Sequence, residues 1–221
     1  RMDVDSVRGK QAHDNLIRLF EEHRIDILVG TQMVVKGLDF EKVDLVGILD
    51  ADGLLSFADF RANERAFQLM EQVSGRSGRK HSRGKVMIQA MQVKHPILDL
   101  LTRHDYENFF ESEMVARKEF GYPPFTRLIQ ITLKHKDKSK VSQAAAELNT
   151  FLQQDLRGMI TGPAEPIISR IRNQYLMEIL IKLPKDHRLP TFKKVILNHI
   201  QLMHSDKRFV SVQVIADADP V

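Results

Sequence analysis

The feature that most constrains this sequence is a helix-breaking segment, Gly-Tyr-Pro-Pro-Phe, at residues 121–125. Neither proline can continue a helix, and each favours extended geometry in the residue before it. The segment ends a charge-rich apolar periodicity over residues 97–120 that predicts helix. We therefore expect a first domain over residues 1–96, a helical linker over 97–123 and a second domain over 124–221.

Before this break, helix-like and strand-like segments alternate along the chain. An apolar stripe predicts a helix over residues 11–22, and another is expected over 58–73. Short β-branched runs predict strands at 25–29, 43–49 and 85–91. Strands that alternate with helices need crossover connections and a largely parallel sheet, so the first domain is predicted to be α/β.

After the break, the expected order is strand, helix, strand, strand, helix, strand. The strands are expected at residues 128–135, 167–171, 175–182 and 209–216, the helices at 139–156 and 189–204, and a Gly-Pro turn at 162–163. This order is typical of the ferredoxin-like α+β arrangement, an antiparallel sheet with two helices on one face.

Composition narrows the functional classes. The 221 residues include no cysteine, which excludes disulfides, thiolate nucleophiles and cysteine-based zinc sites within them. We expect no metal site, and we expect His199 and His204 to be surface or hydrogen-bonded groups. No apolar run approaches the roughly 20 residues of a membrane span, and no secretory leader is present, so a cytoplasmic monomer is predicted.

The net charge of +4 is unevenly distributed. Residues 1–123 contain 18 Lys and Arg against 20 Asp and Glu, a net charge of −2, whereas residues 124–221 contain 15 against 9, a net charge of +6. The basic excess of the second domain is compatible with phosphate contacts, and an ordinary solvated face is the alternative.

The most specific motif is QVSGRSGR at residues 72–79. Its two glycines let the backbone turn tightly, so Arg76 and Arg79 can both project toward one anion. A planar guanidinium is suited to bidentate phosphate recognition. A basic surface turn is the less favoured explanation.

Two further segments in the first domain carry polar side chains directly after predicted strands. The first is GTQMVVKGLDF at residues 30–40, where a ligand-binding loop belongs in an open α/β sheet. The second contains Asp50 and Asp52, which are able to hold a hard cation but are more simply explained as turn caps or partners of arginines. Phe57 and Phe60 are expected in the core, with stacking on DNA as the alternative.

In the second domain, a predicted hairpin carries Arg170, Arg172 and Tyr175. Two arginines beside an aromatic ring suit phosphate contacts combined with base stacking, so we consider these residues candidates for DNA binding. An ordinary polar hairpin tip would explain the pattern equally well.

Together, residues 30–40 and 72–79 resemble motifs V and VI of superfamily 2 helicases. The segments at 50–53, 59–65 and 121–125 make the resemblance closer, to the primosomal replication-restart DNA helicases, the PriA family. The resemblance covers essentially the whole chain and is most distinctive in the first domain. It implies a second RecA-like helicase lobe, incomplete at its N-terminus, followed by the C-terminal domain of that family.

The resemblance also assigns roles to residues. It implies that Arg76 and Arg79 act as arginine fingers on the γ-phosphate of ATP, with Gln72 sensing the nucleotide. Asp39 would contact the ribose or link nucleotide to DNA. The remaining expected contacts are Lys36 and Gly37 in the nucleotide loop, and Gly30, Thr31 and Gln32 on the DNA backbone.

The sequence contains no G-x-x-x-x-G-K-[ST] phosphate loop. The resemblance therefore implies an ATP-dependent 3′-to-5′ DNA helicase whose ATP and Mg²⁺ are bound mainly by a preceding lobe, with zinc held by cysteines before residue 1. This fragment alone is expected to be inactive. The implied partners are forked and single-stranded DNA, single-stranded DNA-binding protein and primosome proteins. The alternatives are a non-enzymatic DNA-binding module and the second lobe of another superfamily 2 helicase.

Overall fold

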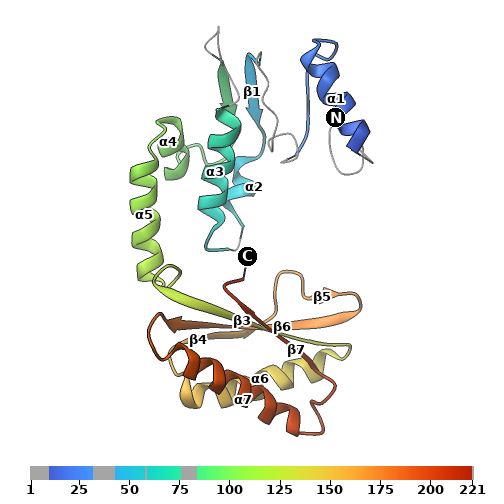
Figure 1. Ribbon diagram of the computed structural model, residues 1–221, viewed down its shortest axis with the longest axis vertical. Coiled ribbons are helices and arrows are strands. Elements are labelled where there is room, and N and C mark those ends of the chain that lie inside the picture. The colour runs from blue at the N-terminus through green and yellow to red at the C-terminus, as the bar shows by residue number, and fades with distance from the viewer. Residues whose placement is uncertain (1–9, 32–42, 58, 76–83, 221) are drawn as a thin grey trace. The chain divides into compact units, whose positions relative to one another are not determined.

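The structure, a computed structural model, describes residues 10–31, 43–57, 59–75 and 84–220 (Figure 1). The chain divides into two compact units, which we call unit 1 (residues 1–113) and unit 2 (residues 114–221). The boundaries expected at residues 96 and 123 remain predictions, and each unit is described by itself below.

Unit 1 contains a parallel pair of strands and several helices. Strand β1 (Leu45–Ile48) pairs in parallel with β2 (Lys85–Ile88), so the two carboxyl ends lie at the same edge. The helices are α1 (Lys10–Glu21), α2 (Ala51–Leu55), α3 (Ala62–Ser74), α4 (Pro96–Thr102) and α5 (Tyr106–Glu119), the last of which continues into unit 2. The α/β class predicted for the first domain is confirmed.

Buried aromatic and aliphatic side chains fix α3 within unit 1. The rings of Phe67 and Phe109 stack with their centroids 4.2 Å apart, and both side chains are buried. Met70 is fully buried in the same cluster. An ion pair of 2.8 Å between Arg65 and Asp59 links the start of α3 to the preceding turn. The end of α3 is therefore held by packing on its buried face.

Unit 2 is a ferredoxin-like sheet, as predicted. Its strands are β3 (Thr126–His135), β4 (Ile160–Ala164), β5 (Arg170–Ile171), β6 (Gln174–Pro184) and β7 (Gln213–Ala218), and its helices are α6 (Lys138–Asp155) and α7 (Leu189–Ser205). The strand order is β4-β6-β3-β7 with antiparallel pairing throughout, and β5 pairs with β6. Helices α6 and α7 cover one face of this sheet (Figure 1).

Side-chain alternation places the core of unit 2 between the sheet and its helices. On the central strands, Ile131 lies opposite Ile179, and neither is exposed to solvent. Leu148 and Leu152 of α6 are also fully buried in this cluster. Every second residue is buried from Ile129 to Leu133 on β3 and from Met177 to Leu183 on β6, as expected for strands with one face against helices.

Several predicted elements differ from the structure. Residues 25–29 were expected to form a strand but are irregular in the structure. The helix expected from residue 58 begins instead at Ala62, after the short helix α2. The helical pattern over 97–120 is divided into α4 and α5 by a turn in which His104 has a positive φ of 54°.

The Gly-Pro turn expected at residues 162–163 is also wrong, because both residues lie inside β4. This strand is at the edge of the sheet, where a proline without an N–H group is tolerated. Within the described ranges, no helix is both long and apolar enough to cross a membrane.

Candidate phosphate and nucleic-acid sites

The carboxyl edge of the parallel strands carries two aspartates with structural roles. Asp50 caps α2 by accepting a 3.1 Å hydrogen bond from the backbone N–H of Gly53. A Cβ at Gly53 would lie 2.7 Å from an Asp50 carboxylate oxygen, so a side chain there would displace the capping carboxylate. Asp52 accepts hydrogen bonds from the backbone N–H groups of Met91 at 2.6 Å and Gln92 at 3.1 Å.

The backbone hydrogen bonds also affect the ionisation of Asp52. The hydrogen bonds from Met91 and Gln92 lower the pKa of Asp52 below its usual value. Both carboxylates accept hydrogen bonds from backbone N–H groups. The prediction that these residues cap turns is therefore confirmed for Asp50, and Asp52 links the segments that follow β1 and β2. In the part of the chain that the structure describes, no group of three or more candidate ligands converges as a metal site.

Helix α3 leads into the glycine-arginine motif. Gln72 is exposed on its last turn, and the backbone N–H of Gly75 closes the helix by donating to the carbonyl of Glu71 at 3.0 Å. Arg76 and Arg79 lie outside the described residues. Their assignment to the γ-phosphate therefore rests on the sequence. The structure shows only the start of the motif, where Gln72 is exposed to solvent.

Only part of the other predicted loop is described. Gly30 forms an isolated β-bridge, and Gly30 and Thr31 are both exposed. Gln32, Lys36, Gly37 and Asp39 lie outside the described residues. The predicted contacts of this loop with nucleotide and DNA remain predictions.

Among the sequence candidates in unit 2, the structure brings Arg170 and Tyr175 together. They form a cross-strand pair between β5 and β6, with the Arg170 guanidinium 4.9 Å from the centre of the Tyr175 ring. Tyr175 is half-buried and packs against the core of unit 2. The guanidinium thus covers part of the tyrosine ring and itself offers a planar surface at the hairpin.

Arg172 lies at the tip of the same hairpin. Arg172 and Asn173 have positive φ angles of 48° and 64°, the geometry of a two-residue type I′ turn. Asparagine and glycine suit this turn, whereas a left-handed arginine is uncommon. Arg172 is exposed, so the turn presents a cation to solvent at some conformational cost.

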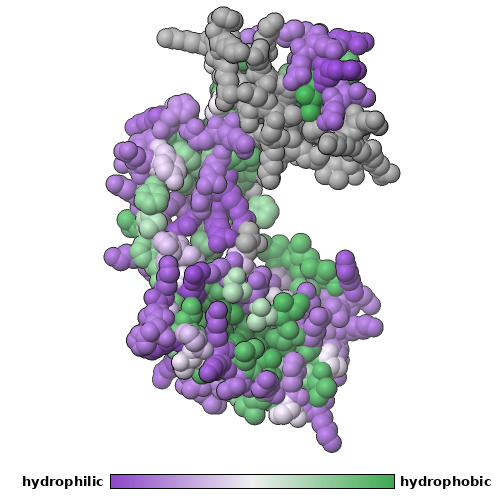
Figure 2. Space-filling view, viewed as in Figure 1, coloured by the Kyte–Doolittle hydropathy of each residue, from purple (hydrophilic) through white to green (hydrophobic). Residues whose placement is uncertain are grey.

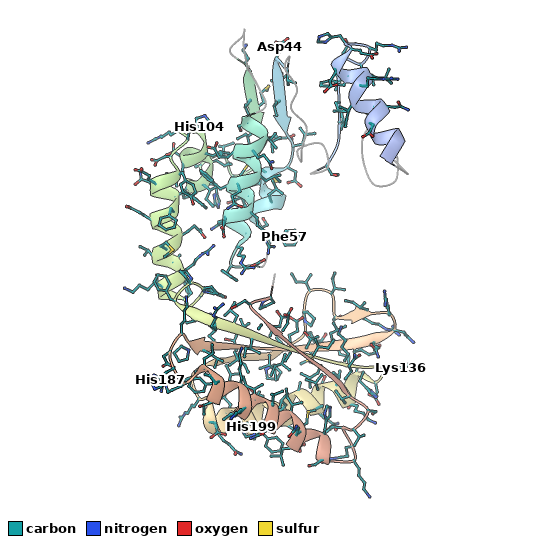
Figure 3. The ribbon with its side chains drawn as sticks, in the orientation of Figure 1. Asp44, Phe57, His104, Lys136, His187 and His199 are labelled. Carbon is teal, nitrogen blue, oxygen red and sulfur yellow. The ribbon has the colours of Figure 1, made fainter. Side chains whose placement is uncertain are left out.

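The hairpin belongs to a larger positive region, which we call the cationic end of unit 2. This end comprises Lys134, Lys136, Lys138 and Lys140 from the junction of β3 and α6, and Arg170 and Arg172 from the hairpin. The sheet register explains the gathering, because His135 at the end of β3 lies opposite Tyr175 at the start of β6. In Figure 3, Lys136 and His187 mark opposite ends of unit 2.

Acidic groups at the cationic end are engaged by neighbours. Asp137 caps α6 through the backbone N–H of Lys140 at 3.2 Å. Glu165 pairs with Lys138 at 2.6 Å, and this hydrogen bond raises the lysine pKa above its usual value. These acids therefore engage a backbone N–H group and Lys138. Of the hairpin arginines, Arg170 donates a hydrogen bond to the side-chain oxygen of Asn173, which uses one of its five N–H donors, and Arg172 is exposed. This region was not predicted from the sequence, although lysines at every second position from 134 to 140 were a signal.

Two other sequence expectations are settled by contacts. His199 pairs with Asp155 at 2.7 Å, and His204 lies 2.9 Å from the carbonyl oxygen of Val212, which confirms that both are partnered. Phe57 was expected in the core, but 70% of its side-chain surface is exposed, so that prediction is wrong. It lies in the loop after α2 (Figure 3).

Comparison with known families accounts for both units. The helicase conserved C-terminal domain matches residues 2–81, and the primosomal protein N C-terminal domain matches residues 118–221. The α/β unit followed by a ferredoxin-like unit is therefore a second RecA-like helicase lobe joined to a primosomal C-terminal domain.

Curated relatives agree with this class. The chain is 42% identical over 201 residues to replication restart protein PriA of Bacillus subtilis, covering 90% of this chain and 25% of the relative. It is 39% identical to PriA of Synechocystis, covering 89% of this chain and 23% of the relative, and 35% identical to PriA of Chlamydia pneumoniae, covering 100% of this chain and 29% of the relative. The chain belongs to the PriA family and matches the C-terminal part of the replication restart proteins of that family. It spans about a quarter of the length of these relatives.

Proposed function

We propose that this chain is the C-terminal part of an ATP-dependent 3′-to-5′ DNA helicase that restarts replication at forks. The observation that carries the proposal is the combination, in one chain, of the helicase C-terminal domain with the primosomal C-terminal domain. Helix α3 supports it, because its packed end leads directly into the glycine-arginine motif.

In this proposal, the nucleotide lies between this lobe and another lobe that holds its phosphates. Arg76 and Arg79 stabilise the negative charge that develops during phosphoryl transfer, and Gln72 helps to sense the nucleotide. In this proposal Asp50 and Asp52 are not Mg²⁺ ligands, because one oxygen of Asp50 and both oxygens of Asp52 accept backbone hydrogen bonds. The proposal therefore assigns Mg²⁺ to the other lobe and, because these residues include no cysteine, assigns zinc to another part of the protein.

The cationic end of unit 2 is proposed as a DNA-binding surface. Lysines and arginines that neutralise phosphates release counterions, so such binding weakens steeply as salt rises. The expected ligands are forked and single-stranded DNA, and single-stranded DNA-binding protein and primosome proteins are the proposed protein partners.

Two measurements test the proposal. The 221-residue chain should bind labelled fork DNA at low salt, with log affinity falling by about 0.9 per phosphate contact for each unit of log salt. The full-length protein should unwind a duplex with a 3′ single-stranded tail in the presence of ATP and should leave a 5′-tailed duplex intact. Absence of fork binding at low salt would contradict the DNA-binding part, and unwinding of the 5′-tailed substrate alone would contradict the stated polarity.

A further inference from the structure

Three isoleucines are exposed beside the arginines of the cationic end. The exposed fractions are 85% for Ile167, 64% for Ile168 and 45% for Ile171. Isoleucine is among the residues most often buried in proteins, and clustered exposed apolar side chains mark contact surfaces. Figure 2 shows hydrophobic surface among the hydrophilic atoms of unit 2. These three residues, with Arg170 and Arg172, are called the hairpin prong below.

The hairpin prong is anchored at several points. Glu165, just before the isoleucines, is held by Lys138 at the start of α6. The carbonyl of Ser169 accepts a 2.9 Å hydrogen bond from the backbone N–H of Leu176 in β6. The I′ turn at Arg172 and Asn173 closes the far side. The isoleucines are therefore presented by a fixed backbone that is continuous with a central strand.

The chemistry of the hairpin prong selects one class of ligand. Projecting apolar side chains flanked by arginines suit insertion between bases, with the guanidinium groups on the adjacent phosphates. Bases accessible in this way occur where a duplex opens into single strands, because unstacking there is least costly. In a uniform duplex the arginines could contact the phosphates, but the isoleucines could not contact the bases, which are stacked and paired.

We propose that the hairpin prong is a wedge that contacts unstacked bases at the junction between duplex and single-stranded DNA. This inference rests on the proposed DNA-binding function of unit 2 and adds to it a substrate preference and its residues. Ile167 and Ile168 provide selectivity for the junction, whereas Arg170, Arg172 and the neighbouring lysines provide affinity for any DNA.

The test compares two matched double variants of the 221-residue chain. Ile167→Gln/Ile168→Gln removes the apolar contact, and Leu197→Gln/Leu202→Gln removes two exposed leucines from α7, where the exposed fractions are 56% and 51%. We expect the isoleucine variant to bind fork DNA about tenfold more weakly while its affinity for blunt duplex is unchanged. The leucine variant should bind both DNAs as the unaltered chain does.

A fluorescent base analogue placed at the fork junction gives a second readout. The unaltered chain should increase its fluorescence by unstacking it, and the isoleucine variant should not. Unchanged fork affinity, or equal losses for fork and blunt duplex, would overturn the wedge, as would an isoleucine variant that loses only the binding of an acidic peptide. If the unaltered chain bound no DNA at low salt, the proposed DNA-binding function itself would fail.

Discussion

The carboxylate of Asp52 accepts a 2.6 Å hydrogen bond from the backbone N–H of Met91, 39 residues further along the chain. The bond joins the segments that follow the two parallel strands of unit 1. It thereby holds together the edge of the sheet at which ligands bind in open α/β folds.

This contact predicts a pH-dependent stability. Because its folded-state pKa is lowered from 3.8, ionised Asp52 stabilises unit 1 fully above that value, and the stabilisation is lost as the pH falls through the lowered pKa. Asp52→Asn should lower the melting temperature by a few degrees at neutral pH, and the difference should vanish in strong acid. Thermal melts of both proteins across this pH range provide the check. The control is Asp99→Asn, which removes an exposed ion pair with Arg103 and should change the melting temperature little. If Asp52→Asn lowered the melting temperature equally at every pH, this explanation would be wrong.

The core of unit 2 predicts a sharp contrast between two leucines on its helices. Leu148 is fully buried between α6 and the sheet, whereas 56% of Leu197 on α7 is exposed. Leu148→Ala should lower the free energy of unfolding by about 2–5 kcal/mol, and Leu197→Ala should change it by less than about 0.5 kcal/mol. Urea unfolding followed by circular dichroism measures both. Similar losses for the two variants would contradict the packing described.

The hairpin tip predicts opposite effects on stability and DNA affinity. Arg172 has a φ of 48°, a conformation that costs a non-glycine residue roughly 1–2 kcal/mol. Arg172→Gly should relieve this strain and, after the entropy cost of glycine of about 0.5–1 kcal/mol, should stabilise unit 2 by about 0.5 kcal/mol. Its affinity for DNA should nevertheless fall, because one phosphate contact is lost. Arg157→Gly, which removes the same charge from the loop between α6 and β4, should bind DNA normally; weaker DNA binding without any gain in stability would disprove the strain argument.

The cationic end predicts a change in salt dependence. Lys134→Gln/Lys136→Gln removes two charges near the hairpin, whereas Lys193→Gln/Lys194→Gln removes two near the start of α7. The first pair should reduce the slope of log affinity against log salt by about 2, and the second should leave it nearly unchanged. Fluorescence anisotropy with labelled DNA over a series of salt concentrations measures the slope. Equal changes of the slope for both double variants would show that DNA binding depends on the total positive charge of unit 2 and not on the cationic end.

Periodicity was sufficient to predict the central strands β3 and β6, because most of their buried residues recur at every second position. It misplaced their neighbours, because the strand expected at 167–171 is only β5 (Arg170–Ile171), and β4 (Ile160–Ala164) contains the residues of the expected turn. It was insufficient for short or irregular elements. Helix α2 has only five residues, too few for a helical period, and the β-branched run at 25–29 has the composition of a strand without forming one. The proline in β4 was misinterpreted because an edge position cannot be recognised without knowing the strand order.

The candidate site residues could be predicted where they are close in sequence, but not where the fold brings them together. Arg170, Arg172 and Tyr175 were identified because they are neighbours in sequence, and the capping role of Asp50 follows from its local turn. The lysines between 134 and 140 join the hairpin only through the register of β3 with β6, which sequence alone does not reveal. Phe57 was misplaced because aromatic residues are usually buried, and its exposure depends on tertiary packing.

The central claim is that the glycine-arginine motif acts on a nucleotide bound by another lobe. The most direct test measures DNA-stimulated ATP hydrolysis and DNA binding by the full-length protein carrying Arg79→Ala. We expect hydrolysis to fall by about 10³-fold or more, as for loss of an arginine finger, with DNA affinity nearly unchanged. Intact hydrolysis together with weakened DNA binding would contradict the account and would assign the arginine to DNA.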